Sequence, residues 1–98
     1  MTHQRAMFGV VKSEVHDDNL LWADGYVYST IAVGDTCYIG GSEETPRVTF
    51  EVVEILHYGQ NLPQIERGMV VRLILKASAE VSDALLPSDE FYDLLPLA

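Results

Sequence analysis

The stretch IAVGDTCYIGG (residues 31–41) decides the fold, because it places a tight turn between two runs of strand-forming residues. Gly34 can adopt a positive φ at little cost, and Asp35 can hydrogen-bond to its own backbone. The turn is followed by TCYI, in which apolar and polar residues alternate until the polar segment GGSEETP ends the strand. The stretch therefore predicts a chain reversal between two β-strands.

The segment before this turn, LLWADGYVYSTIAV (20–33), also alternates with the period of a strand. One side consists mainly of small residues and the other of aromatic ones. The small side comprises Ala23, Gly25, Val27, Ser29 and Ile31, and the aromatic side comprises Trp22, Tyr26 and Tyr28. Small residues on one side indicate a tightly curved interior.

Further strands are predicted on both sides of this region. Residues 7–15 are rich in β-branched and apolar residues, and HDDN follows them as a turn. In residues 47–56 the apolar phase slips by one residue, which indicates a β-bulge or a strand buried on both faces. A loop ending at Gly68 leads to a cleanly alternating strand over residues 69–76. The pattern predicts an all-β fold, a six-stranded Greek-key barrel.

The length of 98 residues fits one domain, with the barrel over about residues 7–78. Residues 79–98 mix acidic residues with Leu, Phe and Tyr and form a separate C-terminal segment. Ser88 can cap a helical turn over DEFYDLL, so we expect a short helical or extended appendage.

Charge and cysteine content restrict the classes of partner and compartment. Six Lys and Arg stand against fifteen Asp and Glu, and the formal net charge of -9 repels phosphates, so nucleic-acid binding is disfavoured. The same charge favours a basic partner or serves solubility alone. Cys37 is the only cysteine, and no run of residues reaches membrane-spanning length. We expect a cytoplasmic protein without a membrane partner.

The order of these elements resembles the second domain of translation elongation factor Tu and related GTPases. The resemblance runs from about Phe8 to Lys76. It is carried by two groups of scaffold positions, Gly25, Ile31, Val33, Gly34, Asp35 and Ile39 in the first and Val52, Ile55, Gly68, Val70 and Leu73 in the second. It implies a barrel of the translation-protein type that contacts partners, among them tRNA. The chain has no phosphate-binding G-x-x-x-x-G-K-[ST] segment, so the resemblance implies no GTPase.

No residue pattern predicts an enzyme, a cofactor or a metal site. Cys37 lies in the apolar phase of its strand, which indicates a buried structural thiol rather than a nucleophile served by His57. The run His16, Asp17 and Asp18 lacks ligand spacing and is interpreted as a polar turn. Neighbouring carboxylates, such as the Glu51 and Glu54 pair, are interpreted as solvated surface.

The aromatic side supplies the candidate binding residues. Trp22, Tyr26 and Tyr28, joined by Tyr38, form an interaction surface if they are exposed, since Trp and Tyr dominate binding hot spots. Two further aromatic residues of the C-terminal segment, Phe91 and Tyr92, either cover this surface or bind another chain. We expect a non-enzymatic module that binds a protein, and a swapped homodimer would satisfy both roles of the C-terminal segment.

Two other functions remain open at this stage. The resemblance to elongation factor Tu allows a module that contacts RNA or tRNA in translation, which would need a local basic strip. The basic residues available for such a strip are Arg47, Arg67, Arg72 and Lys76. The acidity of the chain also allows an inhibitor or immunity-type protein that masks a basic target.

Overall fold

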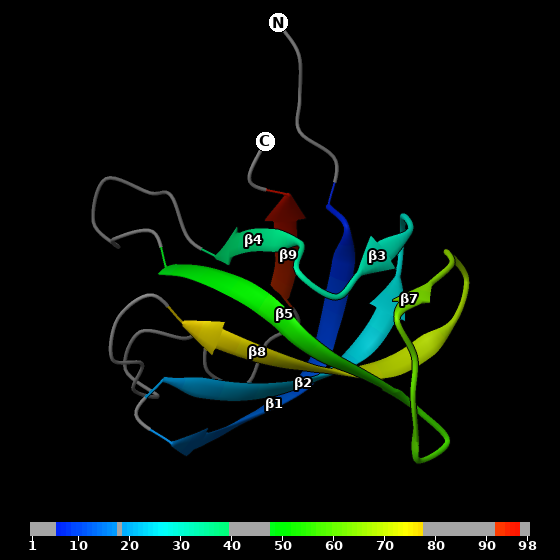
Figure 1. The fold of residues 1–98 in the computed structure, drawn as a ribbon. Coiled ribbons are helices and arrows are strands. Elements are labelled where there is room, and N and C mark those ends of the chain that lie inside the picture. The colour runs from blue at the N-terminus through cyan, green and yellow to red at the C-terminus, as the bar shows by residue number, and fades with distance from the viewer. Residues whose placement is uncertain (1–5, 18, 40–47, 78–91, 97–98) are drawn as a thin grey trace, which may run out of the picture.

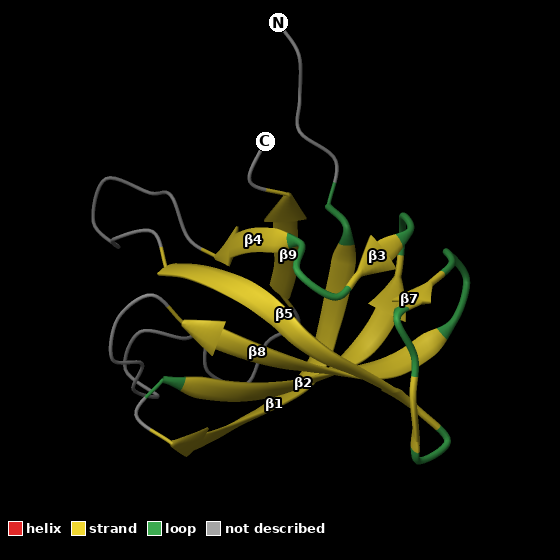
Figure 2. Cartoon of the chain, in the orientation of Figure 1, coloured by secondary structure: helices red, strands yellow, loops and turns green. Residues whose placement is uncertain are grey.

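A computed structural model describes residues 6–17, 19–39, 48–77 and 92–96, and these form strands and loops with no helix (Figure 2). The strands are β1 (Phe8–Asp17), β2 (Leu20–Val27), β3 (Ile31–Ala32), β4 (Thr36–Ile39), β5 (Val48–His57), β6 (Gln60–Asn61), β7 (Gln64–Ile65), β8 (Val70–Ala77) and β9 (Tyr92–Pro96). In these segments no helix is long and apolar enough to cross a membrane. The predicted all-β class is confirmed.

Six of the strands close into an antiparallel barrel in the order β4-β9-β1-β2-β8-β5, and pairing of β5 with β4 completes the ring (Figure 1). Strands β4, β5 and β8 follow one another around the wall, and β9 returns to lie beside β4. This order is a Greek key, as predicted. Strand β6 extends β5 as a short hairpin outside the ring.

The C-terminal residues that the structure describes belong to the barrel wall and are not an appendage. Strand β9 pairs with β1 through Phe8 and Leu94, and with β4 through Tyr38 and Leu95. Met7 N–H also donates to Leu94 O at 2.8 Å. The helical turn predicted over residues 89–95 is therefore wrong for residues 92–95, and the extended alternative holds there.

The barrel interior is filled by apolar side chains from every wall strand. The largest fully buried ones are Phe8, Phe50, Leu21, Ile31, Ile55, Leu73, Leu75 and Leu94. No charged or polar side chain is buried among the described residues. The hydrophobic effect therefore drives closure of the ring, at roughly 25 cal/mol per Å² of apolar surface removed from water.

The predicted reversal at Gly34 and Asp35 is confirmed as a β-turn. Asp35 N–H donates to Ala32 O at 3.0 Å, Gly34 has a φ of 100°, and the Asp35 carboxylate accepts from Ala32 N–H at 2.8 Å. The turn also pairs with β5, since Gly34 N–H donates to Val52 O and Val52 N–H donates to Asp35 O, both at 2.8 Å. The register of β5 shifts just after Val52, which confirms the predicted bulge.

Gly68 holds a second turn of the same kind. Its φ is 92°, its N–H donates to Val27 O, and Val27 N–H donates to Met69 O. Strands β3 and β7, each just before one of these turns in the sequence, pair as a small separate sheet at one end of the barrel (Figure 1). Their buried residues Ile31 and Ile65 cover this end of the core.

The alternation predicted for residues 20–33 holds except at Ser29, and Ile31 is buried as predicted. Ala23, Gly25 and Val27 point inward and are buried, whereas Ser29 is exposed because the chain bends after β2. Gly25 is the tightest point of the wall, since a Cβ atom there would collide with the carbonyl oxygen of Gly9 on β1. Curvature at this point therefore requires a residue without a side chain.

Replacing Gly25 by Ala is expected to lower the free energy of unfolding by about 3 kcal/mol, because β1 and β2 must separate to admit the methyl group. The matched variant Gly34→Ala meets no atom within 4 Å and changes only the backbone strain, so about 1 kcal/mol is expected. Urea unfolding followed by Trp22 fluorescence measures both. Equal losses for the two variants would contradict the close approach at Gly25.

Candidate functional site

The interior of the barrel offers no binding site, because apolar side chains fill it and no polar side chain of the described residues lies within it. Within the described ranges, a functional surface must therefore lie on the outer wall or at an end of the barrel. The outer wall around β1, β2 and β8 carries three of the six aromatic residues that the sequence singled out, Trp22, Tyr26 and Tyr28.

The first outer feature is the Trp22 cluster, made by His16, Trp22, Asp24 and Arg72. Arg72 donates to Asp24 through Nε at 2.7 Å and through Nη2 at 3.1 Å, and its guanidinium carbon lies 4.9 Å from the centre of the Trp22 ring. His16 stacks on the same ring, with centroids 3.6 Å apart. The hydrogen bond to Asp24 raises the pKa of Arg72. Trp22 thus contacts both a cation and an imidazole and is partly buried.

The second outer feature is the tyrosine row, which we define as Tyr28, Tyr26, Val70 and Tyr58. Tyr26 and Val70 are direct partners across β2 and β8, and their exposed fractions are 52% and 57%. Tyr28 is 50% exposed and Tyr58 93%. The row crosses the wall from β1 to the β5–β6 hairpin, and it presents apolar surface that the fold itself does not bury.

Each end of the tyrosine row is fixed by local backbone geometry. Tyr28 lies over Gly9 of β1, where any Cβ atom would collide with the phenol ring. At the other end, Tyr58 and Gly59 have φ angles of 51° and 78° and connect the paired residues His57 and Gln60. Two positive φ angles in a two-residue loop define a type I′ hairpin, which projects Tyr58 into solvent.

A surface depression of about 420 Å³ lies beside the row, between the hairpin and the wall. It is lined by Leu56, Tyr58 and Gly59 on the hairpin side and by Asp24, Val70, Val71 and Arg72 on the wall side. His57 braces the hairpin, because its Nδ1 lies 3.2 Å from Val70 O and donates to it in the tautomer that carries a proton there. The volume of the depression is within the range of ordinary ligand pockets.

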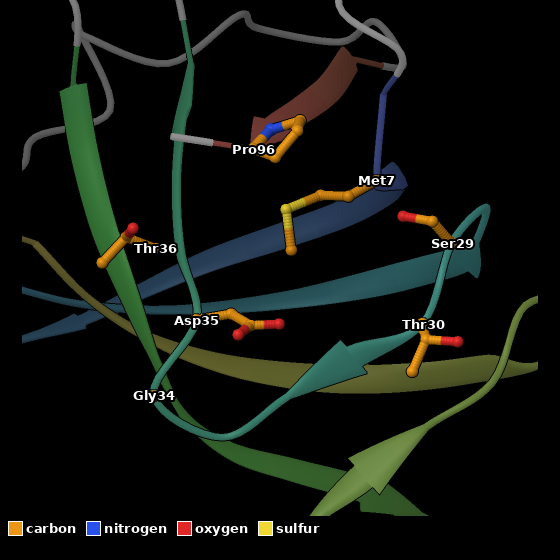
Figure 3. A pocket seen from close by; sticks show the side chains of 7 residues that line it. All are labelled: Met7, Ser29, Thr30, Gly34, Asp35, Thr36 and Pro96. Carbon is orange, nitrogen blue, oxygen red and sulfur yellow. The ribbon is translucent and has the colours of Figure 1, made fainter. Parts of the chain in front are cut away.

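A separate opening, the end pocket, lies where β1, the β2–β3 loop, the β3–β4 turn and β9 meet (Figure 3). Its volume is about 370 Å³, and its lining residues are Met7, Ser29, Thr30, Gly34, Asp35, Thr36 and Pro96. The Asp35 carboxylate points toward the side where Met7 and Ser29 lie (Figure 3). The pocket therefore combines one carboxylate with hydroxyl groups and apolar atoms.

The structure brings together only some of the aromatic residues predicted as one surface. Trp22, Tyr26 and Tyr28 share the β2 side, but Tyr38 lies on β4, three strands away around the ring, and is 7% exposed. Tyr92 takes part in β9 opposite Val10, and Phe91 lies outside the described residues. The described C-terminal residues pair with β1 and β4, so they do not cover the tyrosine row.

Tyr58 is the site residue that the sequence analysis missed. The predicted loop that ends at Gly68 includes Tyr58, whereas the structure puts Tyr58 at the tip of a hairpin. The available signal was the pair Tyr-Gly between strand-forming residues, since Gly at the second position suits a two-residue turn. The signal is weak because Asn or Asp normally precedes that Gly.

The other predicted candidates are widely separated in the fold. Cys37 pairs with Phe50, and His57 lies seven residues further along β5, roughly 23 Å at the usual rise of a strand. Asp18 lies outside the described residues, and among those described no group of three or more side chains could hold a metal ion. Lys76 is the register partner of Glu51, Arg72 is paired with Asp24, and Arg47 is not described.

The fold and these surfaces define a small closed β-barrel with an apolar interior and its polar chemistry on the outside. Comparison of the chain with protein-family models, with curated proteins and with solved structures finds no match. The surfaces of the barrel are therefore the only guide to its function among the described residues.

Replacing Arg72 by Ala is expected to lower the free energy of unfolding by about 1 kcal/mol, because it removes the paired bonds to Asp24 and the cation over Trp22. The loss stays small because the two side chains are 41% and 35% exposed and water screens them. The free energy of unfolding of Arg72→Lys should lie between those of the wild type and Arg72→Ala, since Lys keeps the charge and loses the bidentate geometry. Urea unfolding tests both variants, and a fully stable Arg72→Lys protein would argue against the role of the guanidinium geometry.

Burial, with a smaller contribution from the Asp35 carboxylate, raises the pKa of the Cys37 thiol from 9.0 to about 12. The folded chain keeps this proton while the unfolded chain loses it, so the stability contribution is complete below pH 9 and is lost toward about pH 12. In that window the free energy of unfolding should fall by roughly 1.4 kcal/mol per pH unit more steeply than in Cys37→Ala. Urea unfolding of both proteins at several alkaline pH values gives the slope of the free energy of unfolding against pH. Identical slopes would refute the raised pKa of Cys37.

Proposed function

We propose that this chain is a non-enzymatic binding module that engages a protein partner through the tyrosine row. The observation that carries the proposal is the alignment of Tyr28, Tyr26, Val70 and Tyr58, each at least half-exposed, across one wall of a closed barrel. Tyr is favoured in binding hot spots because it buries a large rigid surface at a small cost in side-chain entropy.

The support beneath the row suits a preformed interface. Tyr26 and Val70 stand on paired strands, and the Tyr58 hairpin is linked to β8 through the His57 contact with Val70 O. A partner that meets a prearranged surface loses less conformational entropy on binding. The depression of about 420 Å³ beside Tyr58 can receive one anchoring side chain of the partner.

The Trp22 cluster supports this choice of surface over the wider aromatic side expected from the sequence. Trp22 already contacts His16 and Arg72, whereas among the described residues no aromatic or cationic side chain stacks on the rings of Tyr26 or Tyr28. We therefore assign Trp22 a structural role in the wall, and we assign contact with the partner to the tyrosines.

The two alternative functions find less support among the described residues. An RNA-contacting strip would need free cations side by side, but Arg72 is paired with Asp24, and Arg67 and Lys76 lie apart, before the start of β8 and near its end. The resemblance to the second domain of elongation factor Tu remains a prediction. Masking of a basic target also remains a prediction, based on the net charge of -9.

The test is capture of the partner from a lysate of the source cells, with and without ribonuclease, using wild-type protein and the double variant Tyr26→Thr, Tyr58→Asn. Thr suits an exposed strand position, and Asn suits the positive φ at residue 58, so both changes preserve the fold. The variant should lose a protein that the wild type captures in the presence of ribonuclease. With the purified partner, calorimetry should show affinity at least about 30-fold weaker.

Val33→Ser is the matched control, because Val33 is 46% exposed but lies in the β3–β4 turn, outside the row. Its binding should equal that of the wild type. Undiminished binding by the double variant would exclude the tyrosine row as the interface. Capture that disappears with ribonuclease would instead favour the RNA-contacting alternative.

A further inference from the structure

The end pocket is built by backbone contacts that hold its one carboxylate in place. Asp35 N–H donates to Ala32 O, and the carboxylate Oδ2 accepts from Ala32 N–H at 2.8 Å. The bond from Ala32 N–H engages Oδ2 and not Oδ1. The turn thus fixes a negative charge at the pocket while leaving one of its oxygens available to a ligand.

We propose that the end pocket binds a primary ammonium group, either of a small free amine or of a lysine side chain. An ammonium group has three N–H donors and no acceptor, so it needs an anion together with further oxygen acceptors. Oδ1 of Asp35 supplies the anion. The Ser29 hydroxyl, on the side toward which the carboxylate points, supplies a neutral acceptor (Figure 3).

The apolar part of the pocket fits the methylene chain that carries such a group. The Met7 side chain and the Pro96 ring form the wall beside Asp35 (Figure 3). A volume of about 370 Å³ is near the lower end for ligand pockets, which suits a short alkyl chain rather than a nucleotide or a sugar chain.

Charge selects against the other small ligands of this size. An anion would meet the Asp35 carboxylate in a chain whose net charge is -9. A calcium ion would need six to eight oxygen ligands, and Asp35 is the only carboxylate residue among the lining residues that the structure describes. A monovalent ammonium group suits this lining, because one carboxylate and one hydroxyl can accept two of its N–H bonds and water can accept the third.

The experiment titrates the whole protein with n-butylammonium chloride, n-butanol and Nα-acetyl-lysine N-methylamide at constant ionic strength. Proton–nitrogen correlation spectra follow the backbone amides of Ser29, Gly34, Asp35 and Thr36. Butylammonium should shift these amides with a weak, millimolar dissociation constant, whereas butanol, which has a similar chain and no charge, should not. A response to the lysine derivative as well would identify a protein side chain as a ligand source, and a response to butylammonium alone would identify free amines.

The matched variant is Asp35→Asn, in which the amide oxygen can still accept from Ala32 N–H while the charge is removed. Its affinity for butylammonium should fall at least about tenfold, and amides far from the pocket should keep their wild-type shifts. Ser29→Ala should weaken binding less. Equal shifts with butanol and butylammonium, no shifts at these amides, or unchanged affinity in Asp35→Asn would each overturn the proposal. None of these results depends on the tyrosine row or on its partner.

Discussion

Closure of the barrel depends on one pairing, the insertion of β9 between β1 and β4. Without β9, the ring would open into a curved sheet with two unpaired edges. The pairing joins Phe8 to Leu94 and Tyr38 to Leu95, and Leu94 is completely buried among the residues of the other strands. Unpaired edges expose backbone donors and acceptors and invite association with other chains. The same five residues therefore complete the core and remove both edges.

Local chemistry explains which parts of the fold could be predicted. The turn at Gly34 and Asp35 follows from one flexible residue and one short acceptor side chain, and the β5 bulge follows from a slip of the apolar phase. Strand β9 could not be predicted in this way, because its partners lie more than 50 residues away in the sequence and its own residues include an acid and a proline. A five-residue strand carries too little periodicity to be distinguished from a helical turn.

The sequence predicts which side chains of the candidate site point outward, but not which of them lie together on one surface. Alternation shows which side chains point away from the interior, but it does not show which wall of a closed ring they occupy. The sequence therefore predicts Tyr38 on the same surface as Tyr26 and Tyr28, although β4 lies opposite β2 in the ring. Trp22 is partly covered by His16 and by Arg72, a residue 50 positions away, and such contacts leave no trace in the local pattern. Tyr58 was missed because its exposure depends on a hairpin and not on strand periodicity.

The late position of β9 in the sequence also has a consequence for how the chain folds. During synthesis, β1 and β4 must wait for residues 92–96 before their outer edges are paired, although every other wall strand is already available. The closing step joins segments at opposite ends of the described chain, so loop entropy must be lost before the contacts that reward it can form. Barrels dominated by such distant pairings fold in milliseconds to seconds, far more slowly than helical bundles. Once β8 has been made and before β9 follows, the five other wall strands can form only an open sheet whose edges on β1 and β4 are unpaired and available to other chains.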